Sequence, residues 1–316
     1  MHTAWGQNLP ILGTGSHALS ESLDAMSGGD LAVKVFDPGA LVGGSAYYDA
    51  VSQGSIDMGF GVSGYHVGKN PAYAFFSSVP FGPRAGEYMA WMLHGGGLEI
   101  AREMYARDNI HFMVCGVIPP ETSGWFREEI KSTEDLRGLK MRFFGLGAKV
   151  MEKFGVSTQL LAGGDIYPAL ELGTIDATEF SMPAIDRNLG FFQIAKYNYF
   201  PGWHQQTTLI ELIVNMDKWN GLSDEYKAMI ETACTAQVAI HLAEGEAIQF
   251  DAMLENEANG VNIKRWSDEI LAEFEAAWKE VIEEEIASSD DSQRIWTSYS
   301  DFRGKYAVWK SNGYLD

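Results

Sequence analysis

The chain has 316 residues, which is enough for one large domain or for two of ordinary size. With 46% hydrophobic and 12% aromatic residues it can build a substantial core, so the composition predicts a folded globular protein. The net charge of −20 argues against nucleic acid or an anionic membrane surface as a partner, but one arginine in a desolvated crevice can still bind a small anion.

The first half of the chain alternates predicted strands with predicted helices. Glycines or turn residues separate these segments. We expect strands over 3–5, 31–36, 56–60 and 110–117, and helices from Gly13 to Gly28-Gly29, over 47–53 and over 85–106. This alternation predicts an α/β fold with a mainly parallel sheet.

Residues 138–205 carry two charges at the ends of predicted strands. Leu139, Met141 and Phe143 alternate with polar or basic neighbours, which places Arg142 on the opposite face of a strand. A second strand over 175–180 carries Glu179 near its end. Charges at strand ends in an α/β domain face the ligand crevice, so both residues are candidates for binding. A purely structural Arg142–Glu179 ion pair is the other interpretation.

One segment of the first half recurs in the second half. Six residues reappear at a constant offset: Gly44, Tyr48, Ala50, Gly54, Ile56 and Asp57 correspond to Gly163, Tyr167, Ala169, Gly173, Ile175 and Asp176. Both copies are typical of a helix, a glycine stop and a strand. We interpret them as parts of two related lobes that face each other across a crevice.

The C-terminal third is predicted to be helical. Ser223 is the expected N-cap of a long run to about Asn259, and residues 268–287 form a second amphipathic helix. Helices of this length usually span lobes or pair with a second copy of the chain.

The two cysteines, Cys115 and Cys234, lie far apart and show no metal-binding spacing. Cys115 falls within an apolar strand, where we expect a buried, inert thiol. The cysteine count alone leaves the redox compartment open.

The sequence has no recognisable catalytic motif. Its seven histidines lack HxH or HExxH spacing, and neither a G-x-S-x-G elbow nor a Walker-type loop occurs. Residues 13–18 weakly imitate a dinucleotide fingerprint, with Asp37 near the position of the acidic partner. The pattern favours binding over catalysis. An α/β enzyme, which residues 13–18 would make dinucleotide-dependent, is the alternative from another class.

Four motifs resemble the solute-binding proteins of tripartite ATP-independent periplasmic (TRAP) transporters, and closely their 2-oxo acid-binding branch. They are DLRGLKMR at 135–142, GGDIYPAL at 163–170, GTIDATE at 173–179 and YFPGWH at 199–204. Shorter matches occur at 80–82, 95–98 and 124–126, and the likeness is colinear from about Trp5 to Trp219.

The resemblance implies a fold of two α/β lobes, joined by crossing hinge strands and followed by long C-terminal helices. We expect residues 1–117 and about 207–250 to form lobe I, residues 118–206 to form lobe II, and residues 251–316 to form helices for lobe packing and dimerisation.

The resemblance also implies a ligand site. Arg142 matches the arginine that clamps the ligand carboxylate, and its planar guanidinium suits that bidentate contact. Glu179 and the backbone carbonyl of Phe180 match a pair that binds a bridging cation. Glu121 stands where that branch commonly has glutamine, so two carboxylates favour Ca²⁺ over Na⁺. Tyr65 is either a lobe I contact or an ordinary half-buried tyrosine.

The resemblance therefore implies a periplasmic receptor, not an enzyme. It would bind a small 2-oxo or 2-hydroxy monocarboxylate such as pyruvate or lactate and deliver it to membrane permease subunits. We expect a homodimer and a leader that has been removed from this sequence. The run at 181–186 departs from the family pattern and leaves the exact substrate open. A larger or aromatic carboxylate is the alternative ligand, given the phenylalanines at 143, 144, 180, 191 and 192.

Overall fold

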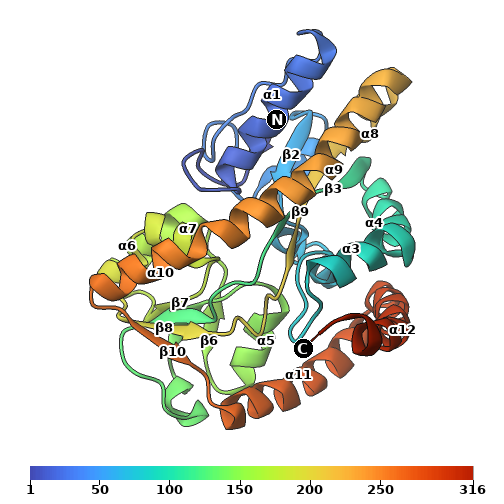
Figure 1. The fold of residues 1–316 in the computed structure, drawn as a ribbon. Helices are drawn as coiled ribbons and strands as arrows, with labels where there is room; N and C mark the ends of the chain where they lie inside the picture. Colours follow the sequence, from blue (N-terminus) through green and yellow to red (C-terminus); the bar gives the residue numbers. More distant parts are fainter. Residues whose placement is uncertain (316) are drawn as a thin grey trace.

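Two β-sheets organise the fold, and the structure, a computed structural model, describes residues 1–315 (Figure 1). The first sheet has the order β1-β2-β9-β3, with bounds His2–Thr3, Met58–Gly61, Thr208–Asn215 and Ile110–Ile118. The second has the order β10-β8-β4-β7-β5-β6, with bounds Asn262–Arg265, Tyr197–Phe200, Gly124–Phe126, Ala177–Thr178, Lys140–Arg142 and Ser157–Gln159. We call the parts built on these sheets lobe I and lobe II.

Both sheets are mixed, so the prediction of a mainly parallel sheet was wrong. Strand β9 reaches lobe I from lobe II and runs antiparallel to both β2 and β3. Strand β4 reaches lobe II from lobe I and runs antiparallel to both β7 and β8. In each sheet the antiparallel strand is thus the one that enters from the other lobe. Residues 119–123 and 201–207 are the two crossing segments.

Six short helices cover lobe I: α1 (Gly13–Ser27), α2 (Tyr47–Ser52), η1 (Ser63–His66), η2 (Pro71–Phe76), α3 (Ala85–His94) and α4 (Gly97–Ala106). The helix that we predicted over 85–106 is two helices, because the chain turns at Gly95-Gly96 and Gly96 has a φ of 93°. The strand that we predicted over 31–36 is reduced to one bridge between Phe36 and His2, since β1 is only two residues long.

Lobe II contains η3 (Thr133–Leu136), α5 (Gly145–Lys153), α6 (Gly163–Glu171), α7 (Pro183–Asn188) and η4 (Phe191–Gln193). Gly173, with a φ of 71°, follows the end of α6 as the sequence predicted. The strand expected over 175–180 spans only Ala177–Thr178, so Glu179 lies in the loop just beyond it.

Five helices follow β9: α8 (Met216–Asn220), α9 (Asp224–Ala247), α10 (Gln249–Ala258), α11 (Asp268–Ser288) and α12 (Asp290–Gly313). The Ser223 hydroxyl caps α9 as predicted, by accepting a hydrogen bond from the backbone N–H of Tyr226. Helix α9 packs on lobe I and α10 packs on α7 of lobe II, so together they run diagonally across the molecule (Figure 1). Strand β10 lies between α10 and α11, in the range where we expected only helices.

A disulfide joins Cys115 of β3 to Cys234 of α9. The prediction of an inert thiol at Cys115 was therefore wrong. Helix α9 packs along β3, and this brings together two cysteines that the sequence separates. Disulfides persist mainly in oxidising compartments outside the cytoplasm. Within residues 1–315, none of the helices is both long and apolar enough to cross a membrane.

Candidate functional site

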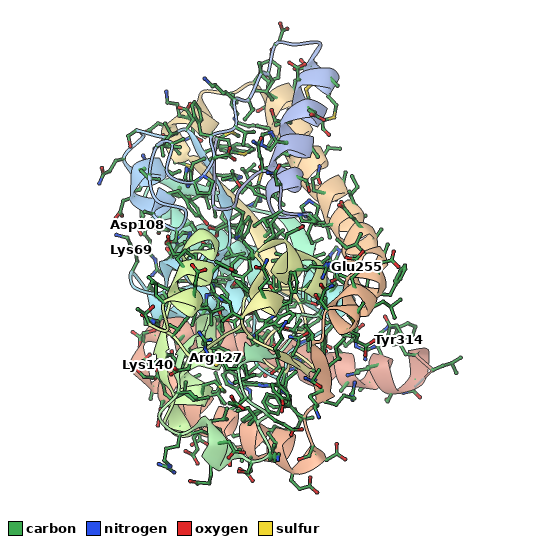
Figure 2. All side chains as sticks on the ribbon, turned by 90° about the vertical axis from the view of Figure 1, so that its left-hand side faces the viewer. Lys69, Asp108, Arg127, Lys140, Glu255 and Tyr314 are labelled. Carbon is green, nitrogen blue, oxygen red and sulfur yellow. A yellow bond between two sulfur atoms is a disulfide. The ribbon has the colours of Figure 1, made fainter. Side chains whose placement is uncertain are left out.

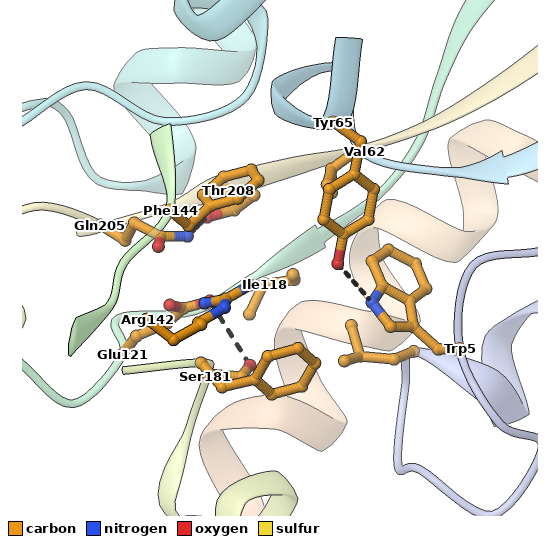
Figure 3. Close-up of a pocket in the computed structure, with 12 residues that line it drawn as sticks. Trp5, Val62, Tyr65, Ile118, Glu121, Arg142, Phe144, Ser181, Gln205 and Thr208 are labelled. Carbon is orange, nitrogen blue, oxygen red and sulfur yellow. Dashed lines mark hydrogen bonds between the residues drawn. The ribbon is translucent and has the colours of Figure 1, made fainter. Parts of the chain in front are cut away.

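A cavity lies where the two lobes meet, with about 270 Å³ of space free of protein atoms, including space open to solvent (Figure 3). Its walls come from both lobes and from both crossing segments: Trp5, Leu12, Val62, Tyr65, Ile118, Glu121, Arg142, Phe144, Phe180, Ser181, Gln205 and Thr208. In Figure 3, Arg142, Glu121 and Gln205 gather at one end, while Trp5 and Tyr65 lie at the other. The charged groups therefore lie at one end of the cavity, with the rings of Phe144 and Phe180 beside Arg142, and Trp5 and Tyr65 form the other end.

Arg142 is the last residue of β5 and is 1% exposed. Its Nη1 donates to Oε1 of Glu179 at 2.7 Å and to the Glu179 carbonyl at 2.9 Å, and its Nε donates to the Leu161 carbonyl at 3.2 Å. Nη2 has no hydrogen-bond partner among residues 1–315, so a planar donor group remains for a ligand. The ion pair that we considered as a structural alternative thus exists, and it lies in the wall of the cavity.

Glu179 is fully buried beside Arg142. Its Oε1 also accepts a hydrogen bond from the backbone N–H of Phe144 at 2.5 Å, while its Oε2 lies 3.5 Å from Nε2 of His204. Burial by itself would raise the pKa of the Glu179 carboxyl, but Arg142 and His204 outweigh it and hold that pKa below its ordinary value. Glu179 therefore carries its negative charge inside the protein.

Glu121 comes from the first crossing segment and is 2% exposed. Its Oε1 accepts a long hydrogen bond of 3.4 Å from the Ser181 hydroxyl, and its Oε2 has no partner within the described residues. Burial, followed by the charges of Glu179 and Asp186, raises the pKa of the Glu121 carboxyl well above its ordinary value. A cation beside Glu121 would oppose this shift, because a nearby positive charge favours the charged form of a carboxyl group.

Asp186 of α7 is a third buried acid, which sequence reasoning did not select. It accepts hydrogen bonds from Nε1 of Trp125 at 2.7 Å and from the backbone N–H of Ser181 at 3.0 Å. Burial raises the pKa of Asp186 to about 7. Its bonds fix the start of the 181–186 run beside Glu121, where the sequence departs from the family pattern.

The residues fit a bound cation. Glu121, Glu179 and His204 each offer a ligand atom, and these atoms lie within 4.8 Å of one another. Oε2 of both glutamates and both ring nitrogens of His204 are buried without a hydrogen-bond partner in the part of the chain that the structure describes. Buried acceptors without donors are costly, and a cation would satisfy them. Carboxylate oxygens suit hard cations such as Ca²⁺ and Na⁺.

The other predicted site residues also border the cavity. Phe180 follows Glu179, its ring lies 5.1 Å from the Arg142 guanidinium, and its carbonyl accepts no hydrogen bond from residues 1–315. Tyr65 is half-buried in η1, where its hydroxyl accepts from Nε1 of Trp5 at 3.2 Å and its ring meets Phe144 of lobe II at 5.6 Å. The structure thus brings four of the five predicted residues to one cavity, and the fifth, Glu179, is paired with Arg142 in its wall.

Sequence reasoning missed His204, Trp5, Ser181, Gln205 and Thr208, and it named Phe144 only for the alternative of an aromatic ligand. His204 belongs to a motif that carries the family resemblance, but it lies 25 positions from the nearest acid in the cluster and shows no metal-binding spacing (204 − 179 = 25). Trp5, Ser181 and Gln205 come from loops and a crossing segment, where local pattern carries little signal, and Thr208 is the first residue of β9. The glycines at 13 and 15 do not follow a strand; Gly15 packs against His241 instead.

Comparisons with known proteins agree with this architecture. The family described as bacterial extracellular solute-binding protein, family 7 (DctP) matches residues 2–289. A monocarboxylate 2-oxoacid-binding periplasmic protein of Nostoc sp. is 35% identical over 309 residues, which cover 98% of this chain and 85% of that protein.

Three solved TRAP solute-binding proteins share the fold over 99% of this chain. The one from Bordetella bronchiseptica, a mixed-occupancy dimer with copurified calcium and picolinate, has a TM-score of 0.96 and 35% identity over 93% of its own length. The protein from Pseudoalteromonas atlantica, with sodium and pyruvate, has a TM-score of 0.93 and 29% identity over 95% of its length. The protein from Colwellia psychrerythraea, with calcium and pyruvate, has a TM-score of 0.93 and 30% identity over 95% of its length. This chain therefore belongs to the DctP family of bacterial extracellular solute-binding proteins, and it is a TRAP-type solute receptor rather than an enzyme.

Proposed function

We propose that the protein captures a small 2-oxo or 2-hydroxy monocarboxylate, such as pyruvate or lactate, in the periplasm and delivers it to TRAP permease subunits. The observation that carries the proposal is the buried Glu121–Glu179–His204 cluster beside Arg142, at one end of a cavity with apolar walls. A small anion with adjacent oxygens can face both a guanidinium and a cation from one position.

Each residue has a distinct role in this proposal. Arg142 binds the ligand carboxylate through Nη2, and Glu179 both orients Arg142 and offers Oε2 to a cation. Glu121, Glu179 and the Phe180 carbonyl would hold the cation, which supplies positive charge that bridges the protein and the ligand oxygens. His204 lies within reach as a further ligand. The two carboxylates favour Ca²⁺ over Na⁺.

An aromatic carboxylate is the second candidate ligand. Of the five phenylalanines that suggested it, Phe144 and Phe180 line the cavity, whereas Phe143 and Phe191 are buried in the core. The similar Bordetella bronchiseptica protein copurified with picolinate, an aromatic carboxylate. The apolar walls could stack on a flat ring.

We also propose that the protein forms a homodimer through the end of α12. The first half of α12 packs on lobe I, with Ile295 and Tyr299 buried. The second half carries the exposed apolar side chains of Val308 and Trp309, and Tyr314 and Leu315, just beyond the helix, are exposed too. Figure 2 shows this end, with Tyr314 labelled, projecting beyond the rest of the molecule. Such a projecting apolar end is typical of an interaction site.

The ligand proposal is tested by calorimetric titration of pyruvate into metal-stripped protein, with and without Ca²⁺, beside Na⁺ as the alternative ion. We expect heat of binding only when a cation is present, with Ca²⁺ more effective than Na⁺. The variant Arg142→Ala should not bind pyruvate, either with or without Ca²⁺. Binding of pyruvate to metal-free protein, or full binding by Arg142→Ala, would contradict the proposed roles. Picolinate in place of pyruvate tests the aromatic alternative.

A further inference from the structure

Trp5 separates the ligand cavity from a second, larger hollow. That hollow, which we call the outer cleft, is bounded by residues 4–9, 37–39 and 43–44 of lobe I and by residues 162–165 of lobe II. It contains about 1080 Å³ of space free of protein atoms, including space open to solvent. Trp5 is the residue that borders both the cavity and the outer cleft.

The charges at the far end of the cavity fix which part of a ligand faces Trp5. Arg142 and Glu121 lie at the end opposite to Trp5 and Tyr65 (Figure 3). A carboxylate at Arg142 therefore directs the remaining carbon atoms of the ligand toward the apolar walls. A ligand that grows by successive methylene groups grows toward the indole of Trp5.

Trp5 is held as a fixed wall. The residue is 3% exposed, its Nε1 donates to the Tyr65 hydroxyl at 3.2 Å, and its ring packs edge-on against Phe60 at 6.2 Å. Its backbone N–H also donates to the Thr3 hydroxyl at 3.4 Å. A longer ligand cannot displace this indole without breaking these contacts.

The outer cleft, by contrast, offers room. Glycines form much of its lining, and nothing lies within 4 Å of the position that a Cβ would occupy at Gly6, Gly39 or Gly164. Removing the indole would therefore join the cavity to an existing open space.

We propose that Trp5 sets the maximum chain length of the ligand. The indole limits the receptor to short 2-oxo or 2-hydroxy acids, and a smaller residue at this position admits longer ones through the outer cleft. This inference rests on the proposed function and adds a specificity determinant to it.

The test is a series of titrations with pyruvate, 2-oxobutanoate, 2-oxohexanoate and 2-oxooctanoate at saturating Ca²⁺. For the natural protein we expect affinity to fall by at least about tenfold between 2-oxobutanoate and 2-oxohexanoate, the scale on which a pocket rejects an ill-fitting methylene. In Trp5→Ala this fall should disappear. Trp5→Phe, which keeps an aromatic wall, should retain part of it. The control Trp278→Ala removes an equally buried indole from α11 and should keep the natural profile.

The outcomes separate this inference from the proposed function. Equal binding of pyruvate and 2-oxooctanoate by the natural protein would overturn the role of Trp5 and leave the receptor function standing. A steep fall that persists in Trp5→Ala and in Trp5→Phe would also overturn it. Failure of the natural protein to bind any member of the series would overturn both. Because the first comparison uses only the natural protein, it holds even if Trp5→Ala folds poorly.

Discussion

Glu121 is one of the two carboxylates of the proposed cation site, and it stands at the position where the resemblance leads us to expect glutamine. Glu121→Gln keeps the size of the side chain and removes one negative charge from the proposed cation site. Because calcium affinity depends on the number of charged ligands, we expect Ca²⁺ to bind about tenfold or more weakly, with a smaller loss for Na⁺. Calorimetric titration of Ca²⁺ and Na⁺ in the presence of pyruvate measures both changes.

The exposed Glu128 provides the control, since Glu128→Gln removes the same charge outside the site. An unchanged ratio of calcium to sodium affinity in Glu121→Gln would remove Glu121 from the set of ligands. The raised pKa of Glu121 also predicts how Ca²⁺ binding depends on pH. A proton competes with the cation there, so Ca²⁺ binding should weaken as the pH falls.

The buried His241 of α9 makes the free energy of unfolding depend on pH. Its ring is 1% exposed against Gly15 and Gly116, and burial lowers the pKa of His241 to about 4, from an ordinary value of 6.5. Between these two values the unfolded chain binds more protons than the folded protein, so the free energy of unfolding falls as the pH drops across that window. The loss amounts to about 3 kcal/mol when the whole window is crossed.

Urea unfolding at pH 7, 6 and 5 measures this dependence. We expect His241→Gln to unfold with a shallower pH dependence than the natural protein, because glutamine does not titrate. His94→Gln, at an exposed position, should keep the natural slope. Equal slopes in all three proteins would show that the buried ring is not the source.

At the scale of elements, the disulfide is the strongest single constraint on lobe I. It joins β3 to α9 across a sequence separation of 119 residues, so it removes much conformational freedom from the unfolded chain. We expect the double variant Cys115→Ala/Cys234→Ala to lose roughly 2–4 kcal/mol of unfolding free energy. The urea midpoints of the two proteins, measured without reductant, give the difference. Adding dithiothreitol should lower the midpoint of the natural protein and leave that of the double variant unchanged.

Helices with strong end signals could be predicted from the sequence, whereas pairing between distant segments could not. Ser223 and Gly28 mark helix ends with local chemistry, and the structure confirms both. The break at Gly95-Gly96, the mixed sheets and the disulfide all depend on contacts between segments far apart in the chain. No local pattern reports such contacts.

The same distinction holds for the candidate site. The strand-end positions and the family motifs together selected Arg142, Glu179, Phe180, Glu121 and Tyr65. Four of them line the cavity, and Glu179 lies behind them as the ion-pair partner of Arg142. His204 and Trp5 lie on a crossing segment and a loop, so only the folded arrangement of the lobes brings them to the ligand. His204 was identified by its buried ring nitrogens, which lack hydrogen-bond partners within the described residues. Trp5 was identified because it borders both the cavity and the outer cleft.

At the scale of the whole molecule, the projecting end of α12 predicts self-association. Val308→Asp/Trp309→Asp places charge on the exposed apolar surface and should shift a dimer to a monomer. Size-exclusion chromatography with light scattering at micromolar concentration measures the mass. Ser311→Asp adds a charge to the same helix without removing an apolar side chain and should stay dimeric. A natural protein that is monomeric under these conditions would refute the homodimer.

The interruption between α9 and α10 has a mechanical consequence. Helix α9 is fastened to lobe I by the disulfide, and α10 is fastened to lobe II, where the Gln249 side chain accepts from the backbone N–H of Ala184 at 3.0 Å. Ile248 is the only residue between the two helices, so we expect a change in the angle between the lobes to bend the chain there. The angle between α9 and α10, on the outside of the molecule, would then follow the angle between the lobes. A permease that contacts both α9 and α10 could distinguish the ligand-bound receptor from the ligand-free one by the angle between these helices, without contacting the ligand.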